Sequence, residues 1–177
     1  MTMNRSLLCL ALPAALAALG PSASVRAAVY SNGSATAQMQ VQLTILPGCT
    51  VATTPMTFNP VQGSGTGPVS STSSLTAICT ASTGYNIGLN AGTTLNSTET
   101  NRLLAGTTTG NTTTIPFGLF QDASYATPWG NTQGTNTLAD SGTGSLKTYT
   151  VYGRATLSDT MPAPDVYSST VTATVYF

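Results

Sequence analysis

Apolar and polar residues alternate along several short stretches of the chain, and the longest of these stretches lies near the N-terminus. In residues 35–45 every second residue is apolar, and the residues between them are threonine or glutamine. A period of two places the apolar side chains on one face of a β-strand, and the segment would extend about 36 Å. Pro47-Gly48 then ends the run. The apolar positions of this segment, which we call the arm, are Ala35, Ala37, Met39, Val41, Leu43 and Ile45.

Shorter runs of the same kind predict further strands. The last of them, residues 167–177, places Val171, Ala173, Val175 and Phe177 on one face and threonine with Tyr176 on the other. Glycine, serine, threonine and asparagine fill the stretches between the runs, and no segment has the period of a helix. This pattern is typical of an all-β sandwich. The other strands are expected at residues 74–79, 85–89, 115–120 and 147–154, and the main loops at 62–72, 105–114 and 130–145.

Composition agrees with this fold class and excludes several kinds of function. Only 6% of the residues are charged, the formal net charge is zero and 41% are hydrophobic. Disorder goes with low hydrophobicity and high net charge, so the scarcity of charge does not predict a disordered chain. A protein that binds nucleic acid needs a basic patch, and the chain has none, so we expect no nucleic-acid partner.

The first residues have the pattern of a secretory signal. Arg5 precedes an apolar run at residues 7–19, which is too short to span a bilayer. Small residues at Val25 and Ala27 favour cleavage after Ala27. The sequence therefore predicts a signal peptide at residues 1–27, export of the chain and removal of the signal.

Two cysteines, Cys49 and Cys79, remain after cleavage at that site. In an oxidising compartment a pair of cysteines favours a disulfide, which in the chain-entropy model contributes roughly 3.6 kcal/mol for a loop of about 30 residues. A metal site and two free thiols are the alternatives. A zinc site is disfavoured because the chain has no histidine.

The sequence offers no arrangement typical of an enzyme. Without histidine, a Ser-His-Asp or Cys-His site cannot form. The glycine-rich stretch at residues 63–67 lacks the lysine of a phosphate-binding loop, and Asp140-Ser141-Gly142 lacks the later acidic ligand of a calcium loop. Five acidic residues are scattered along the mature chain, and their spacing does not indicate a catalytic pair. We therefore expect no enzymatic activity, cofactor or metal, and we expect Trp129 in the core or at an interface.

Several stretches, in order along the chain, resemble the spore coat protein U domain family, whose members include subunits of archaic, Csu-type chaperone–usher pili. The individual motifs are short, but their ordered combination covers nearly all of the mature chain. The matching stretches are residues 46–51 (LPGCTV), 79–80 (CT), 85–92 (YNIGLNAG), 101–104 (NRLL), 119–125 (LFQDASY) with 129–130 (WG), 149–154 (YTVYGR) and 166–177.

The resemblance implies an immunoglobulin-like sandwich that lacks its final strand. A periplasmic chaperone would fill the resulting groove first, and the donor strand of an identical or related subunit would then replace it at an outer-membrane usher. The arm would be that donor strand, within an N-terminal extension at residues 28–48 before a pilin domain at 49–177. The expected function is a structural pilus subunit at the cell surface, in adhesion and biofilm formation. The strand bordering the groove and contacting the chaperone would contain Val171, Ala173, Val175, Tyr176 and Phe177.

Other interpretations remain open at this point. From its periodicity alone, the arm is more typical of the first strand of a complete sandwich, and the family resemblance reverses that preference. The chain could also be a protective coat protein of a spore or cell surface, or a carbohydrate- or surface-binding module at a pilus tip. A secreted hydrolase is disfavoured because the chain offers no credible catalytic group.

Overall fold

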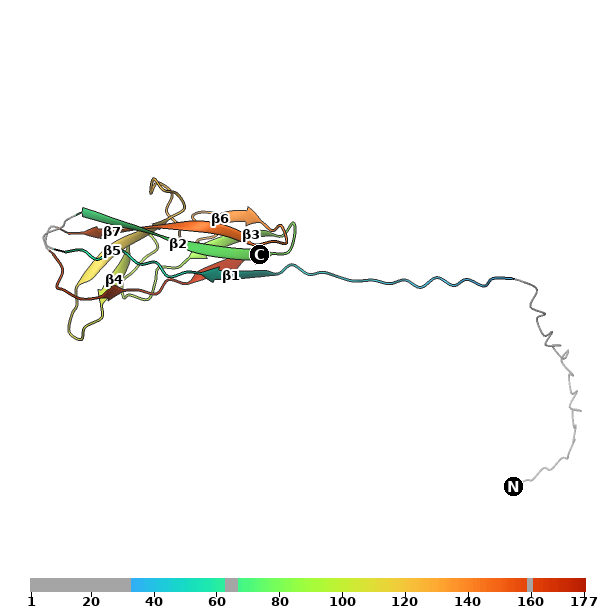
Figure 1. Cartoon of the computed structure of the whole chain (residues 1–177), viewed down its shortest axis with the longest axis horizontal. Helices are drawn as coiled ribbons and strands as arrows, with labels where there is room; N and C mark the ends of the chain where they lie inside the picture. Colours follow the sequence, from blue (N-terminus) through green and yellow to red (C-terminus); the bar gives the residue numbers. More distant parts are fainter. Residues whose placement is uncertain (1–32, 63–66, 159–160) are drawn as a thin grey trace, which may run out of the picture. The chain divides into compact units, whose positions relative to one another are not determined.

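The computed structural model describes residues 33–62, 67–158 and 161–177, and this part of the chain contains nine β-strands and no helix (Figure 1). The predicted signal peptide lies outside the described residues. The strands are β1 (Cys49–Thr53), β2 (Gly67–Cys79), β3 (Gly84–Leu89), β4 (Arg102–Gly106), β5 (Thr114–Phe120), β6 (Leu138–Ser141), β7 (Lys147–Leu157), β8 (Tyr167–Ser168) and β9 (Ala173–Tyr176).

These strands form two antiparallel sheets. One has six strands in the order β1-β2-β7-β5-β4-β8, and the other has three in the order β6-β3-β9. In β5 and β7 every second side chain is buried over part of the strand, which is the period that a half-buried strand requires. The prediction of an all-β sandwich is confirmed.

A continuous apolar core joins the two sheets. Trp129, from the loop after β5, is completely buried in it, as the sequence predicted, and its indole Nε1 donates to the Ile87 carbonyl at 2.8 Å. The buried members from the six-stranded sheet are Leu75, Ala77, Cys79, Ile115, Phe117, Leu119, Val151 and Ala155, and those from the three-stranded sheet are Tyr85, Ile87 and Leu89.

The single strand predicted at residues 167–177 is wrong, because the chain changes sheets there. β8 pairs with β4, whereas β9 pairs with β3. The crossing between them is held by side chains at residues 90–93: the Thr93 hydroxyl accepts from the Thr170 amide, and the Asn90 side chain accepts from the Thr172 amide. Alternation along a sequence cannot show on which of two sheets each half lies.

Two predicted loops also contain strands. β2 begins at Gly67, inside the loop expected at residues 62–72, and β6 lies inside the loop expected at 130–145. The first half of β2 is rich in serine and threonine, and these residues are as polar as a loop. β6 has no fully buried side chain, so its sequence lacks the apolar alternation that marks a strand.

One charged side chain lies inside the core. Arg102 at the start of β4 is only 1% exposed, and its guanidinium donates hydrogen bonds to backbone carbonyls alone. The acceptors are Asn90 at 2.9 Å, Glu99 at 2.8 Å, Leu89 at 2.7 Å and Trp129 at 2.8 Å. Burial lowers the pKa of Arg102 to about 10, and the nearby Glu99 carboxylate opposes that shift. Because every acceptor is a backbone atom, this cation joins β4 to the end of β3 and to the loop of Trp129.

We expect Arg102→Met to lower the free energy of unfolding by about 3–5 kcal/mol, because it leaves several buried carbonyls without a donor. Arg154→Met is the matched control, since Arg154 is an exposed arginine on β7 whose guanidinium lies 5.3 Å from the Tyr125 ring centroid, and its loss should cost no more than about 1 kcal/mol. Urea unfolding followed by tryptophan fluorescence measures both variants. Equal effects would contradict the role assigned to Arg102.

Candidate functional site

An apolar cavity of about 880 Å³ opens at one side of the sandwich. Residues 56–61, which follow β1, form one wall, and residues 161–169, which include β8, form the other. Its remaining walls come from Val69 of β2, Leu104 of β4, Ile115 of β5, and Ala155 and Leu157 of β7. The cavity is therefore lined mainly by hydrocarbon.

A glycine on β7 shapes one wall of this cavity. A Cβ atom built on Gly153 would lie 2.1 Å from Met56 Sδ, so no other residue fits at this position without displacing Met56. Met56 and Phe58 can consequently pack against β7 and the core.

The two segments that line the cavity are continuous in the chain with two strands at sheet edges, β1 before residues 56–61 and β9 after residues 161–169. β1 is the outer strand of the six-stranded sheet, and β9 is the outer strand of the three-stranded sheet. Their Cα atoms approach within 8 Å, but no ladder pairs them in the described part of the chain. We call this region, made of β1 with residues 54–61 and of residues 161–177, the open edge. Backbone groups along such an edge can pair with an added strand.

The five residues predicted to border a groove all lie on the open edge. Val171, Ala173 and Val175 are half-buried and pack against the core. Tyr176 is half-buried as well, and its hydroxyl donates to Asn131 Oδ1 at 3.1 Å. Phe177 follows β9 and is 60% exposed. Their contact with a chaperone stays a prediction.

The arm belongs to no strand, and its side chains are exposed along its whole length. The larger apolar members, Met39, Val41 and Leu43, are each 85% exposed and Ile45 is 77% exposed. The first strand of the sandwich is β1, which begins only at Cys49, so the alternative that made the arm the first strand of this sandwich is wrong. An exposed apolar stripe of this length is typical of an interaction segment.

The predicted disulfide is present where the arm ends. Cys49 and Cys79 are bonded and are directly opposite each other in the β1–β2 ladder. The ladder continues one step beyond them, because the Thr80 amide donates to the Gly48 carbonyl at 3.0 Å and the Gly48 amide donates to Thr80 Oγ1 at 3.2 Å. The metal site and the free thiols considered as alternatives are wrong.

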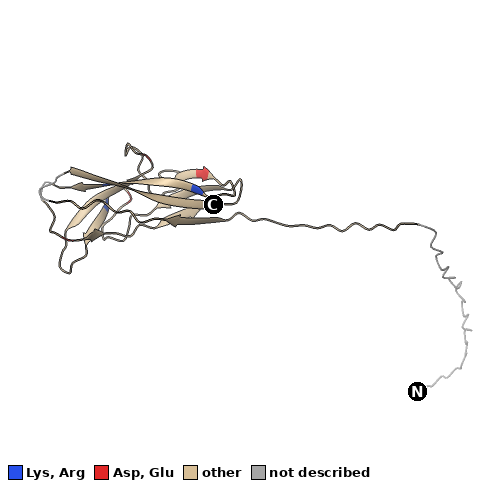
Figure 2. Cartoon of the chain, viewed as in Figure 1, with Lys and Arg blue, Asp and Glu red and all other residues tan. Residues whose placement is uncertain are grey.

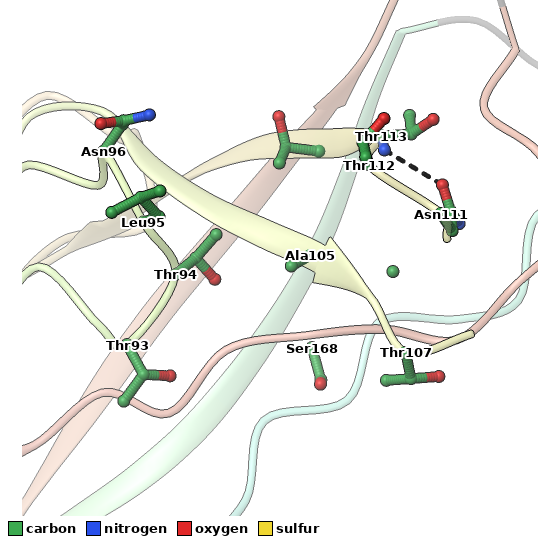
Figure 3. Close-up of a pocket in the computed structure, with 12 residues that line it drawn as sticks. Thr93, Thr94, Leu95, Asn96, Ala105, Thr107, Asn111, Thr112, Thr113 and Ser168 are labelled. Atoms are coloured by element: carbon green, nitrogen blue, oxygen red, sulfur yellow. Dashed lines mark hydrogen bonds between the residues drawn. The ribbon is translucent and has the colours of Figure 1, made fainter. Parts of the chain in front are cut away.

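A second pocket, of about 470 Å³, is lined mainly by residues with hydroxyl or amide side chains (Figure 3). Threonines dominate its lining, together with Leu95, Asn96 and Asn111, and none of its lining residues is charged. The Asn111 side chain accepts from the Thr113 amide at 3.0 Å, the bond drawn in Figure 3. The lining therefore offers neutral hydrogen-bonding groups.

The charged residues are few (Figure 2), and the described carboxylates are engaged in hydrogen bonds that hold loops together. Asp165 accepts from the Thr108 amide at 3.0 Å and from Asn111 Nδ2 at 2.7 Å, and these bonds lower its pKa. Asp122 caps its own turn through the amides of residues 124, 126 and 127, and Glu99 accepts from the Asn131 amide at 2.9 Å. Their pKa values are lowered in the same way.

A polar network links the two sheets near β6. Lys147 Nζ donates to both oxygens of Asp140 at 2.8 Å, and the Tyr149 hydroxyl donates to Asp140 Oδ2 at 2.5 Å. The Tyr149 hydroxyl is also hydrogen-bonded to the Tyr85 hydroxyl at 2.5 Å. The bonds from Lys147 and Tyr149 lower the pKa of Asp140 to about 2.

No cluster of three or more potential metal-ligating residues occurs in the part of the chain that the structure covers. Within that same part, no helix is long and apolar enough to cross a membrane.

Comparison with known families identifies the domain. The spore coat protein U domain matches residues 35–174, a range that begins at the first residue of the arm. The chain belongs to the spore coat protein U domain family. The resemblance seen in the sequence motifs is thereby confirmed.

A solved structure with the same fold comes from Acinetobacter baumannii. It is the chaperone–tip adhesion subunit pre-assembly complex of archaic chaperone-usher Csu pili. The match has a TM-score of 0.54 and 22% sequence identity, and it covers 76% of this spore coat U chain and 41% of the matched chain. At this identity the likeness concerns the fold. A search of curated proteins gave no match.

The network around Asp140 predicts a specific pH dependence. Because its pKa in the folded protein is below the ordinary value of about 3.9, ionised Asp140 stabilises the fold above about pH 4, and this contribution is lost as the pH falls towards 2. We expect Asp140→Asn to be less stable than the unmodified chain at pH 6 and to differ from it less at pH 2. Urea unfolding at each pH measures the difference, and a difference that does not change with pH would contradict the assignment.

Proposed function

We propose that this spore coat U domain protein is a structural subunit of a surface pilus and that its arm is a donor strand for the next subunit. The single observation that carries the proposal is the presence, in one chain, of an exposed apolar stripe and an open apolar edge. Each is half of a β-sheet interaction, in which main-chain bonds supply affinity and alternate side chains supply specificity.

Burial of the arm can provide a large part of the assembly free energy. Its four large apolar residues contribute about 1.5–3 kcal/mol each when fully buried, so the gain is on the order of 10 kcal/mol. This figure is an upper bound because ordering an extended segment costs conformational entropy. The opposite face, made of glutamine and threonine, would remain in water.

The geometry of the open edge adds a requirement for strand insertion. A strand hydrogen-bonded to both β1 and β9 needs them about 9.6 Å apart, twice the usual strand spacing. Cα atoms of β1 and β9 lie within 8 Å of each other in the free domain. Insertion therefore requires the two edges to separate beside β1, whereas the cavity between residues 56–61 and 161–169 is already open.

Such an interaction joins different surfaces of successive copies. A head-to-tail contact that does not close on itself generates an open filament. We propose that residues 1–27 direct export, that residues 28–48 form the donor extension and that residues 49–177 form the pilin domain. Adhesion and biofilm formation at the cell surface would be the role of the finished filament.

A chaperone and an usher complete the proposed assembly. The matched solved structure is described as a complex with a chaperone, which supports a chaperone as partner before assembly. We propose that a periplasmic chaperone covers the open edge through Val171, Ala173, Val175, Tyr176 and Phe177. At an outer-membrane usher, the arm of an identical or related subunit would then replace it.

Moving the arm to the C-terminus tests whether the domain lacks a strand. With residues 35–45 attached after Phe177 through a short flexible linker, we expect a monomer whose melting temperature exceeds that of the native chain by at least about 10 °C. Light scattering and thermal unfolding measure the two properties. A control carries the moved segment with its apolar positions changed to serine, and equal stability of all three chains would show that the sandwich is already complete.

A pair of neighbouring substitutions tests which face of the arm matters. Leu43 and Gln42 are both exposed in the free chain but point to opposite faces of an extended segment. We expect Leu43→Asp to abolish polymerisation, because it would bury an unpaired carboxylate, and Gln42→Asp to leave polymers largely intact. Size-exclusion chromatography of purified chains reads out the result, and equal behaviour of the two variants would contradict the proposal.

A further inference from the structure

The arm is joined to the domain by a very short linker, which raises the question of why it does not fold onto its own open edge. Only Leu46, Pro47 and Gly48 separate Ile45 from the first residue of β1. A turn in these residues would lay the arm antiparallel along the free side of β1 as a hairpin. An arm bound in this way would be lost to a neighbour, and the inference below rests on the proposed donor role.

The register of such a hairpin decides which face of the arm is buried. Cys49 and Val51 face the core, and residues directly opposite each other in an antiparallel pair share a face. A two-residue turn at 46–47 would place Thr44 and Gln42 opposite them, and the polar face would be buried. Shifting the pairing by one residue exchanges the faces, so an apolar-inward hairpin needs a loop with an odd number of residues, and the shortest such loop has three.

Two three-residue loops keep Ile45 or Leu43 opposite Cys49 and so leave nearly the whole arm paired. A loop at residues 46–48 places Ile45 opposite Cys49, and a loop at 45–47 places Leu43 opposite Cys49. Loops of this length are built as a type I turn followed by a third residue in the left-handed conformation, with a positive φ. The third residue would be Gly48 in the first loop and Pro47 in the second.

Gly48 is held in a different conformation. Its amide and its carbonyl both pair with Thr80, it does not have a positive φ, and the disulfide lies directly beside it. The first loop would therefore require both bonds to break. The second loop is excluded by the proline ring, which fixes φ near −65°. A five-residue loop at 43–47 would avoid both obstacles but would withdraw Leu43 and Ile45 from the interface.

We propose that Pro47 and the Gly48–Thr80 bonds together prevent the arm from completing its own domain, so that its partner is a second copy of the chain. Each feature blocks one of the two loops. The bonds to Thr80 keep Gly48 out of the loop at 46–48, and Pro47 cannot adopt the positive φ that the third position of the loop at 45–47 requires. The linker thereby selects pairing between copies over pairing within one copy.

Replacing Pro47 tests this selection in the full-length mature chain. In Pro47→Gly the loop at 45–47 gains a glycine at its third position, so the arm can fold back. In the control, Pro47→Ala, the ring is removed but the alanine Cβ still disfavours the left-handed conformation. The probe is a fluorescent synthetic peptide of residues 35–45, added at nanomolar protein concentration and followed by anisotropy. Amide hydrogen exchange of the arm is measured on the same samples.

We expect the native chain and Pro47→Ala to take up the peptide with exposed, rapidly exchanging arms. Pro47→Gly should bind it at least about 10-fold more weakly, because its own arm competes at a high effective concentration, and its arm amides should be protected. Equal uptake by Pro47→Gly and Pro47→Ala would overturn the inference and leave the donor role standing. A native chain with a protected arm would overturn it as well. Failure of every chain to bind the peptide while the arms exchange rapidly would overturn the donor role itself.

Discussion

The arrangement of the open edge depends on one buried cation. Arg102 is enclosed by the protein, and it is tolerable there because its donors are paired with backbone carbonyls. One of these carbonyls belongs to Asn90, whose side chain accepts from the Thr172 amide just before β9. A continuous path of hydrogen bonds thus runs from the core arginine to the crossing that sets the position of β9. The edge on which the proposed function relies is fixed from inside the domain.

The structure shows how the few charged residues are used. The described carboxylates each cap a turn or join two segments, and the single ion pair, Lys147–Asp140, links β6 to β7 within the described residues. A surface that exchanges one apolar strand for another would be disturbed by an ion left without a partner, which is costly to bury, and Asp165, which lines the cavity, is held by Thr108 and Asn111. Threonine, serine and glutamine keep such a surface soluble without that cost.

Sequence reasoning found the parts of the fold whose signal is local. β3, β5 and β7 carry the alternation of half-buried strands, and two cysteines behind a predicted secretory signal predicted the bond between Cys49 and Cys79. It missed β1, β4 and β6 and the change of sheet after Ser168, because β1 and β4 have only five residues each and neither β6 nor the change of sheet leaves a periodic trace. The open edge could not be predicted from the sequence either. Met56, Phe58 and the segment from Met161 show no hydrophobic periodicity, and they line one cavity only because the fold brings them together. The burial of Arg102 had no signal except its place in the NRLL motif, which the family resemblance supplied.

The disulfide at the base of the arm has a mechanical consequence. In a filament built from such arms, tension enters each domain at Cys49, the first residue of β1. If an edge strand is pulled from its end, its hydrogen bonds to the neighbouring strand break one after another. Here the load meets a covalent bond first and passes to Cys79, at the end of the longest strand of the sheet. That strand pairs with β7 over eleven registered positions, so the force is shared in shear across the middle of the sandwich.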